Sequence, residues 1–150
     1  ALEFGNHTRL IELAGEINTA MPEYVVSRVI DALNDTEKPV RKSRILILGI
    51  AYKADVDDDR ESPSYTIMDL LKKRGAIVSY NDPHVPFIRE GRSNGSVAGR
   101  ECVPITNEYD AIVLCTNHKE YESFDFSSLG VPLIDCRDAS SKRPTQYYAA

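Results

Sequence analysis

The chain has 150 residues, of which 42% are hydrophobic and 27% charged, and its formal net charge is −5. These values are ordinary for one globular domain and exclude a disordered chain. The negative net charge argues against a general nucleic-acid binder, because such proteins displace counterions with a basic face.

Cysteine usage and hydropathy bound the environment of the protein. The chain contains three cysteines, Cys102, Cys115 and Cys136. Their number is odd and none are spaced as C-x-x-C, so neither a disulfide framework nor a zinc site is expected. No apolar run reaches the roughly 18 residues of a membrane span, and no signal-peptide pattern opens the chain. We therefore expect a cytoplasmic protein without membrane contact, and we interpret the start, which lacks methionine, as the interior of a longer protein.

The first segment is predicted to be helical, since apolar residues recur every three or four positions from Leu10 to Leu33. Pro22 lies inside this pattern. Proline lacks an N–H and clashes with the carbonyl four residues earlier, so we expect a kink near Asn18 or two abutting helices. Such a helix either packs on its own domain or serves as a spacer or dimer element, and the pattern leaves both open.

After a polar connector, the pattern changes to short apolar runs, which are typical of strands buried on both faces of a parallel sheet. The runs lie at 45–48, 76–80, 111–115 and 131–135. Together with the helices between them, they predict an α/β, Rossmann-like domain. Its open, mostly parallel sheet has four to six strands and flanking helices, and the long helix precedes it.

The helix between the first two strands has clear boundary signals. Ser62 is its predicted N-cap, Pro63 its first residue, and basic residues followed by Gly75 mark its end. Short helices are also predicted around Glu120 and before Tyr109. Residues 92–100 are expected to be the most flexible stretch, and the residues after Ser140 are expected to be irregular.

Polar residues follow the predicted strands at the edge where open parallel sheets bind ligands. Lys53 follows the first strand and Arg137 the last, so the two would form a cationic pocket in an acidic domain. A diphosphate fits such a pocket, helped by the N–H groups at the start of the helix that Ser62 caps. The alternative is that both cations only neutralise the aspartates at 55–59, and spacing alone leaves both readings open.

A dinucleotide fingerprint is only partly present. G-x-G-x-x-G would require three glycines where the chain has Gly49, Ala51 and Ala54. The two added β-carbons obstruct the close approach of a pyrophosphate. Asp82 is placed like the ribose-binding acid of such folds, but the Asp82-Pro83 pair is more typical of a turn that ends a strand. We therefore expect a nucleotide bound in another mode.

Metal and catalytic sites are not predicted. Asp55, Asp57 and Asp59 have the spacing that opens a calcium loop, but the glycine and glutamate required at its sixth and twelfth positions are missing. The cysteines in or beside buried strands are interpreted as inert small hydrophobes. His118 is a candidate base at a strand end, but as a lone loop histidine it is interpreted as solvated. No complete catalytic set is found.

Several motifs carry a family resemblance. The sequence from Gly49 to Pro63 reads GIAYKADVDDDRESP, which closely resembles the G-x-A-[FY]-K…D-x-R-E-S-P signature of the UDP-glucose/GDP-mannose dehydrogenase family. The match continues in DPHV at 82–85, in the stretch 109–118 and in IDCR at 134–137. Within the family, the residues at 21–26 and 84–86 are most similar to the branch that acts on UDP-N-acetylhexosamines.

The resemblance implies a division of the chain and of the chemistry. Residues 1–36 would end a central helical dimerisation domain, and residues 37–150 would form a C-terminal UDP-sugar-binding domain. The family oxidises the C6 hydroxymethyl of a UDP-sugar, here a UDP-N-acetylhexosamine or UDP-glucose, to a carboxylate with NAD. Its catalytic cysteine and NAD domain lie upstream, so this part would carry no catalytic residue and would be inactive alone. The parent would be a homodimer.

Site residues follow from the same resemblance. It implies that Lys53 contacts the UDP diphosphate, that Tyr52 lies along the uridine and that Arg137 supports the nucleotide. Arg60 would reach across a cleft toward NAD, or would pair with an aspartate of its own loop. Two other hypotheses stay open. One is a free-standing Rossmann-like nucleotide-binding or regulatory module without catalysis, and the other is an interaction domain that dimerises through the long helix.

Overall fold

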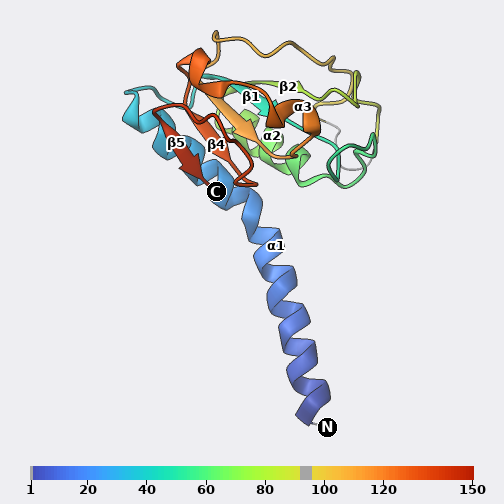
Figure 1. The fold of residues 1–150 in the computed structure, drawn as a ribbon. Coiled ribbons are helices and arrows are strands. Elements are labelled where there is room, and N and C mark those ends of the chain that lie inside the picture. The colour runs from blue at the N-terminus through green and yellow to red at the C-terminus, as the bar shows by residue number, and fades with distance from the viewer. Residues whose placement is uncertain (1, 92–95) are drawn as a thin grey trace.

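Five parallel strands form one sheet in the part of the chain that the structure, a computed structural model, describes, which is residues 2–91 and 96–150 (Figure 1). The strands are β1 (Arg44–Leu48), β2 (Ile77–Asn81), β3 (Ala111–Leu114), β4 (Leu133–Asp135) and β5 (Tyr147–Ala149). The helices are α1 (Leu2–Asp35), α2 (Pro63–Lys73) and α3 (Lys119–Glu122), with a 3-10 turn at Phe126–Leu129. The predicted Rossmann-like, open parallel fold is confirmed.

The strand order is β2-β1-β3-β4-β5. The chain passes from β1 through α2 to β2 and then returns to the other side of β1 to form β3. The direction of winding therefore reverses between β1 and β3. At such a reversal the connections leave in opposite directions, which opens a crevice at the carboxyl ends of the two strands.

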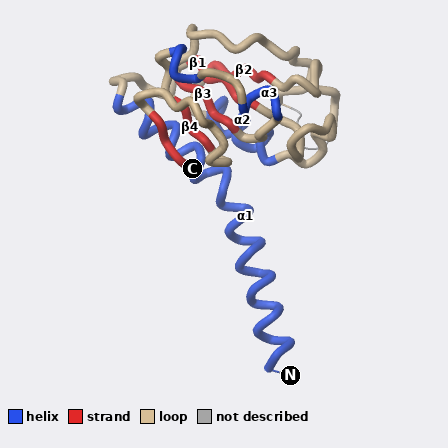
Figure 2. Tube along the Cα trace, in the orientation of Figure 1, coloured by secondary structure: helices blue, strands red, loops and turns tan. Residues whose placement is uncertain are grey.

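Both faces of the sheet are covered, which explains the continuous apolar runs (Figure 2). Ile45 and Ile47 of β1 pack against the second half of α1 and against α2. Leu46 and Leu48, which point to the opposite face, pack with Tyr121 of α3 and with the 3-10 turn. The central strands β1 and β3 thus alternate between two apolar layers and show no polar face.

Helix α1 is continuous over 34 residues with Pro22 inside it, so of the two predicted alternatives, a kink or two abutting helices, the second is wrong. Pro22 is itself buried, and the turns that follow it place Val25, Val29 and Leu33 in the core. This packing offsets the hydrogen bond that proline removes. The first half of α1 extends away from the domain (Figure 1). Its apolar side chains are exposed at Leu10, Ile11, Leu13 and Ile17. No helix among the described residues is both long and apolar enough to cross a bilayer.

The boundaries of α2 match their sequence signals. The side chain of Ser62 accepts a hydrogen bond from the N–H of Ser64 at 3.3 Å, Pro63 is the first helical residue, and Gly75 adopts a φ of +89° after the last turn. The helix at α3 is confirmed, whereas no helix precedes Tyr109. Of the stretch 92–100 predicted to be flexible, residues 92–95 lie outside the described residues.

The C-terminal tail is more regular than expected, because Tyr147–Ala149 pairs with β4 as a fifth strand. The tail also contacts α1. The Nε atom of Arg28 donates to the carbonyl of Ala149 at 3.2 Å, and the hydroxyl of Tyr148 donates to Asp35. These contacts connect segments more than 100 residues apart, so no local pattern could indicate them.

Candidate functional site

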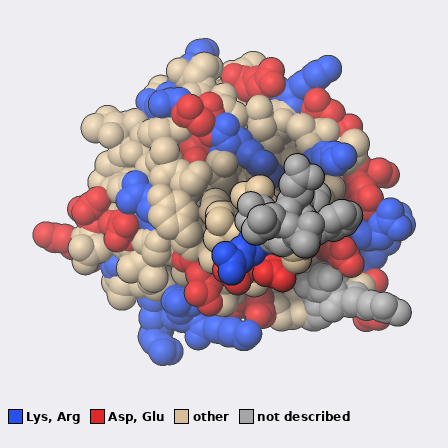
Figure 3. Space-filling model, turned by 90° about the horizontal axis from the view of Figure 1, so that it is seen from below, with Lys and Arg blue, Asp and Glu red and all other residues tan. Residues whose placement is uncertain are grey.

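A cleft of about 630 Å³ lies at the carboxyl edge of the sheet, between α1, the start of α2 and the loops that follow β1 and β4. Its lining comprises Asn18, Met21, Pro22, Val25, Tyr52, Lys53, Pro63, Ser64, Ile67, Cys115, Cys136 and Arg137. A smaller hollow of about 260 Å³ adjoins it, lined by Tyr52, Lys53, Ala54, Thr116, Asn117 and Arg137. Figure 3, which views this edge from below, shows basic side chains beside a hollow on this face. The three residues proposed to bind the nucleotide therefore line one cleft.

The two cations of the cleft, Lys53 and Arg137, form no ion pair with any described residue. Within the described residues, no salt bridge involves Lys53 or Arg137. The ammonium of Lys53 lies 5.9 Å from the ring centroid of Tyr52, and the Nε of Arg137 donates to the carbonyl of Cys115 at 2.9 Å. That bond orients the guanidinium without neutralising it. The structure thus shows no ion pair between either cation and the aspartates at 55–59.

Arg60 is outside the set of residues that line the cleft, and its side chain is 85% exposed. It donates to both carboxylate oxygens of Asp58, at 2.9 and 3.1 Å. The side-chain hydrogen bond from Arg60 lowers the pKa of Asp58 below its ordinary value. In this structure Arg60 thus adopts the local pairing that was the alternative to a cofactor contact.

The N-terminus of α2 has no donor left for a phosphate. Pro63 lacks an N–H, the N–H of Ser64 donates to Ser62 Oγ at 3.3 Å, and the N–H of Tyr65 donates to the Ser62 carbonyl at 3.2 Å. The helix therefore satisfies its own first turn. In this structure the first N–H groups of α2 are thus engaged within the helix cap, and the side chains of Lys53 and Arg137 are the cationic groups that line the cleft.

Asp82 is buried behind the loop that follows β1, with 1% of its surface exposed. Its carboxylate accepts the N–H groups of Ile50 at 2.8 Å, Ala51 at 3.0 Å and His84 at 2.8 Å, and it lies 2.9 Å from His118 Nε2. Burial acts to raise the pKa of Asp82, but the hydrogen bonds from His118 and the three N–H groups outweigh it and lower the pKa. The turn prediction at this residue identified neither the burial nor the partners.

The hydrogen bonds of Asp82 bear on whether this domain could bind NAD as a Rossmann domain does. In a dinucleotide-binding turn, the N–H groups after the first strand face the pyrophosphate, and the acid after the second strand binds ribose. Here Asp82 takes the N–H groups of Ile50 and Ala51 and is inaccessible itself. Gly49 has a φ of +82° and supports only the tight turn. The residues present do not fit NAD in the Rossmann mode.

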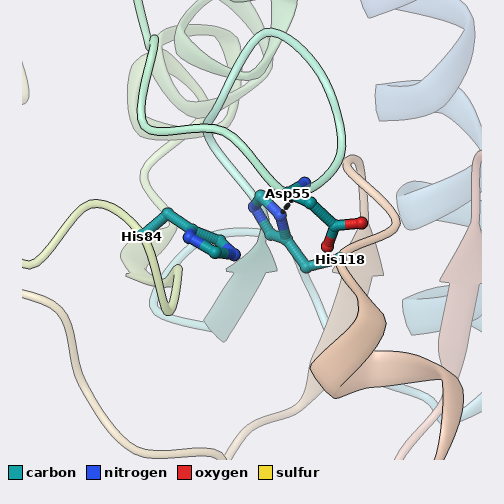
Figure 4. Close-up of side chains that lie close together, drawn as sticks. All are labelled: Asp55, His84 and His118. Atoms are coloured by element: carbon teal, nitrogen blue, oxygen red, sulfur yellow. Dashed lines mark hydrogen bonds between the residues drawn. The ribbon is translucent and has the colours of Figure 1, made fainter.

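His118 was interpreted as solvated, and this is wrong because its side chain is fully buried. Its Nδ1 accepts the N–H of Asp55 at 2.8 Å, and its ring lies beside that of His84, with the centroids 4.7 Å apart (Figure 4). The ring of Tyr121 lies on it as well, at a centroid distance of 5.7 Å. Asp82 and His118 follow the two strands that flank β1. Strand order was the only signal that could have placed them together.

Cys115 and Cys136 follow β3 and β4 at neighbouring positions and both line the cleft. Both are free thiols. A hydrogen bond between the two side chains, together with burial, raises the pKa of Cys136. The pair forms part of the cleft wall beside Arg137.

An open parallel sheet with an unneutralised cationic cleft at its carboxyl edge defines a Rossmann-like domain suited to an anionic nucleotide. Residues 46–141 match the family described as the UDP-glucose/GDP-mannose dehydrogenase family, UDP binding domain. The chain belongs to this family.

Relatives and solved structures agree with this assignment. The chain is 35% identical over 112 residues to a UDP-N-acetyl-D-mannosamine dehydrogenase of Methanococcus maripaludis, and the match covers 73% of this chain. It is 30% identical over 122 residues, or 81% of the chain, to an NDP-N-acetyl-D-galactosaminuronic acid dehydrogenase of Ralstonia solanacearum. The matches span only 26% and 27% of the lengths of these relatives.

Among solved structures, the UDP-D-ManNAc dehydrogenase of Pyrococcus horikoshii superimposes with a TM-score of 0.76 and 26% identity. The match covers 93% of this chain and 33% of that one. The resemblance to the branch acting on UDP-N-acetylhexosamines is thereby confirmed at the level of family and fold.

Proposed function

We propose that this chain is the C-terminal, nucleotide-sugar-binding part of an NAD-dependent UDP-sugar 6-dehydrogenase. The parent enzyme would oxidise the C6 hydroxymethyl of a UDP-sugar to a carboxylate in the cytoplasm. We propose a UDP-N-acetylhexosamine as the sugar nucleotide, with UDP-glucose as the alternative. Catalytic residues and the cofactor domain would be supplied by the rest of the parent protein, so these 150 residues alone would be inactive.

One observation carries the proposal: Tyr52, Lys53 and Arg137 converge on a single cleft, and neither cation has an acidic partner among the described residues. Lys53 would bind the diphosphate as a point charge, and Arg137, already oriented by the Cys115 carbonyl, would donate its remaining N–H groups. The exposed ring of Tyr52 would lie along the uridine.

The surroundings of the cleft complete the proposal. Residues 1–36 would end a helical dimerisation domain, and 37–150 would form the UDP-sugar domain. The exposed apolar stripe at the start of α1 is suited to such a homodimer. Arg60 would contact NAD held by another domain, which requires its bidentate pair with Asp58 to open.

Calorimetric titration with UDP tests the function. Removing a charged hydrogen bond to a phosphate costs about 1.5–3 kcal/mol, so Lys53→Ala should weaken UDP binding by about 10- to 100-fold. Lys73→Ala is the matched control, because Lys73 pairs with Asp69 at 2.9 Å in the last turn of α2, at the opposite edge of the sheet. The control should bind UDP like the unmodified chain.

Titration with NAD⁺ and CMP separates the alternatives. Binding of NAD⁺ without UDP would contradict the proposal and favour a free-standing dinucleotide module. Equal UDP affinity in the Lys53→Ala chain and the unmodified chain would show that the diphosphate binds elsewhere.

A further inference from the structure

His118 has both ring nitrogens engaged in the protein interior. Nδ1 lies 2.8 Å from the backbone nitrogen of Asp55, and Nε2 lies 2.9 Å from Asp82 Oδ2. A backbone N–H can only donate, so Nδ1 must be the unprotonated nitrogen. Nε2 then carries the hydrogen and donates it to Asp82. The structure thus requires the Nε2–H tautomer, and the carboxylate of Asp82 stabilises it.

This bonding also decides against a metal centre at the same place. Asp55, His84 and His118 bring possible ligand atoms within 4.8 Å of one another. Figure 4 shows how the three side chains lie together. A metal would need the Nδ1 lone pair of His118, which already accepts the Asp55 N–H, or Nε2, which carries a proton toward Asp82. His118, together with Asp82 and the N–H of Asp55, therefore forms a hydrogen-bonded support, to which the His84 side chain adds only a ring contact.

The support holds both ends of the short loop that carries Tyr52 and Lys53. At the start of this loop, Asp82 accepts the N–H of Ala51, and the Thr116 hydroxyl donates to the Ala51 carbonyl at 2.7 Å. At its end, His118 accepts the N–H of Asp55.

Asp55 is held on a second side as well. Its carboxylate accepts the N–H of Lys119 at 2.9 Å, and its backbone has a φ of +60°. This left-handed conformation carries a cost for a residue with a Cβ, although a smaller one for aspartate than for most, and the two hydrogen bonds at Asp55 offset it. The exposed residues 52 and 53 thus lie between two anchored positions.

We propose that His118 is a positioning residue for nucleotide binding, which holds Lys53 at the cleft by accepting the Asp55 N–H, while Asp82 fixes its tautomer. The inference rests on the proposed role of Lys53 in binding the UDP diphosphate. It explains why a fully buried histidine and a buried carboxylate lie beneath a loop that is otherwise exposed.

Two substitutions separate the two bonds of His118. The amide oxygen of asparagine lies near the position of Nδ1, so His118→Asn keeps an acceptor for Asp55. Glutamine is one methylene longer and places its amide near Nε2, so His118→Gln keeps a donor for Asp82. We expect His118→Gln to weaken UDP binding by about tenfold and His118→Asn by less than about threefold, although both lose stability.

A variant outside the buried site guards against misfolding. Asp55→Gly keeps the N–H and the positive φ but removes the carboxylate that accepts from Lys119, and we expect it to weaken UDP binding by about threefold. UDP affinity unchanged in His118→Gln, or reduced equally in the asparagine and glutamine variants, would overturn the positioning role.

Amide hydrogen exchange at Asp55 and the ¹⁵N signals of the His118 ring provide readouts that need no nucleotide. Exchange should accelerate in His118→Gln and not in His118→Asn, and the unmodified ring should show the Nε2–H tautomer. If the unmodified chain binds no UDP, the proposed function fails, and exchange still decides whether His118 holds the loop. Unchanged exchange in His118→Gln would overturn the inference even where UDP binds.

Discussion

Replacing Gly49 by alanine is expected to destabilise the domain by about 2–6 kcal/mol, the sum of a strained backbone and an overpacked contact. Gly49 has a φ of +82°, and a Cβ there would lie 2.4 Å from Thr116 Cβ and 2.6 Å from the Thr116 carbonyl oxygen. Thr116 has little freedom to retreat, because its hydroxyl donates to the carbonyl of Ala51. Urea denaturation followed by circular dichroism measures the change.

Gly130→Ala is the control for this substitution. Gly130 also has a positive φ, +65°, but a Cβ at this position would meet nothing within 4 Å. Only the backbone cost of about 1–2 kcal/mol applies. An equal loss of stability in the two variants would show that the approach of Thr116 to Gly49 does not matter.

Replacing Asp82 by alanine should cost about 3–5 kcal/mol of folding free energy, because several donors would lose the buried carboxylate that they share as acceptor. The N–H groups of Ile50, Ala51 and His84 and the Nε2–H of His118 would all lose their acceptor. Thermal and urea denaturation measure the loss. A change below about 1 kcal/mol would contradict the structural role of this carboxylate.

Asp82 should also make the folding stability depend on pH. The pKa of Asp82 is lowered in the folded state from its ordinary value of 3.8, so the ionised carboxylate favours folding. This stability is fully present above the ordinary pKa and is lost as the pH falls through the lower, folded-state pKa. The stability gap between the unmodified chain and Asp82→Asn should therefore narrow below about pH 4. A gap independent of pH would show that the folded-state pKa is not lowered.

The sheet was predictable because its signals are local. Each apolar run became a strand within two residues of the expected boundary, and Ser62 and Pro63 begin α2 as their chemistry requires. The continuity of α1 across Pro22 and the pairing of β5 were not predictable, since both depend on packing against distant parts of the chain.

Some residues of the candidate site were likewise predictable from local signals, and others were not. Lys53 and Arg137 were identified from their places after strands, because the carboxyl ends of parallel strands share one edge. The Asp82–His118 pair was missed, since its members are 36 positions apart and meet only through the order β2-β1-β3. A polar residue after a strand thus indicates the edge on which it lies, whereas its partner depends on topology.

The short strand β5 covers an edge of the sheet that would otherwise be open. All three residues of β4 are buried, and β5 is the only cover that the described part of the sheet provides along that outer edge. A chain truncated before Tyr147 would leave the backbone donors and acceptors of β4 unpaired, and such an open edge accepts a strand from another molecule. Residues 147–149 therefore cover the backbone of β4 at an edge that would otherwise be open to such pairing.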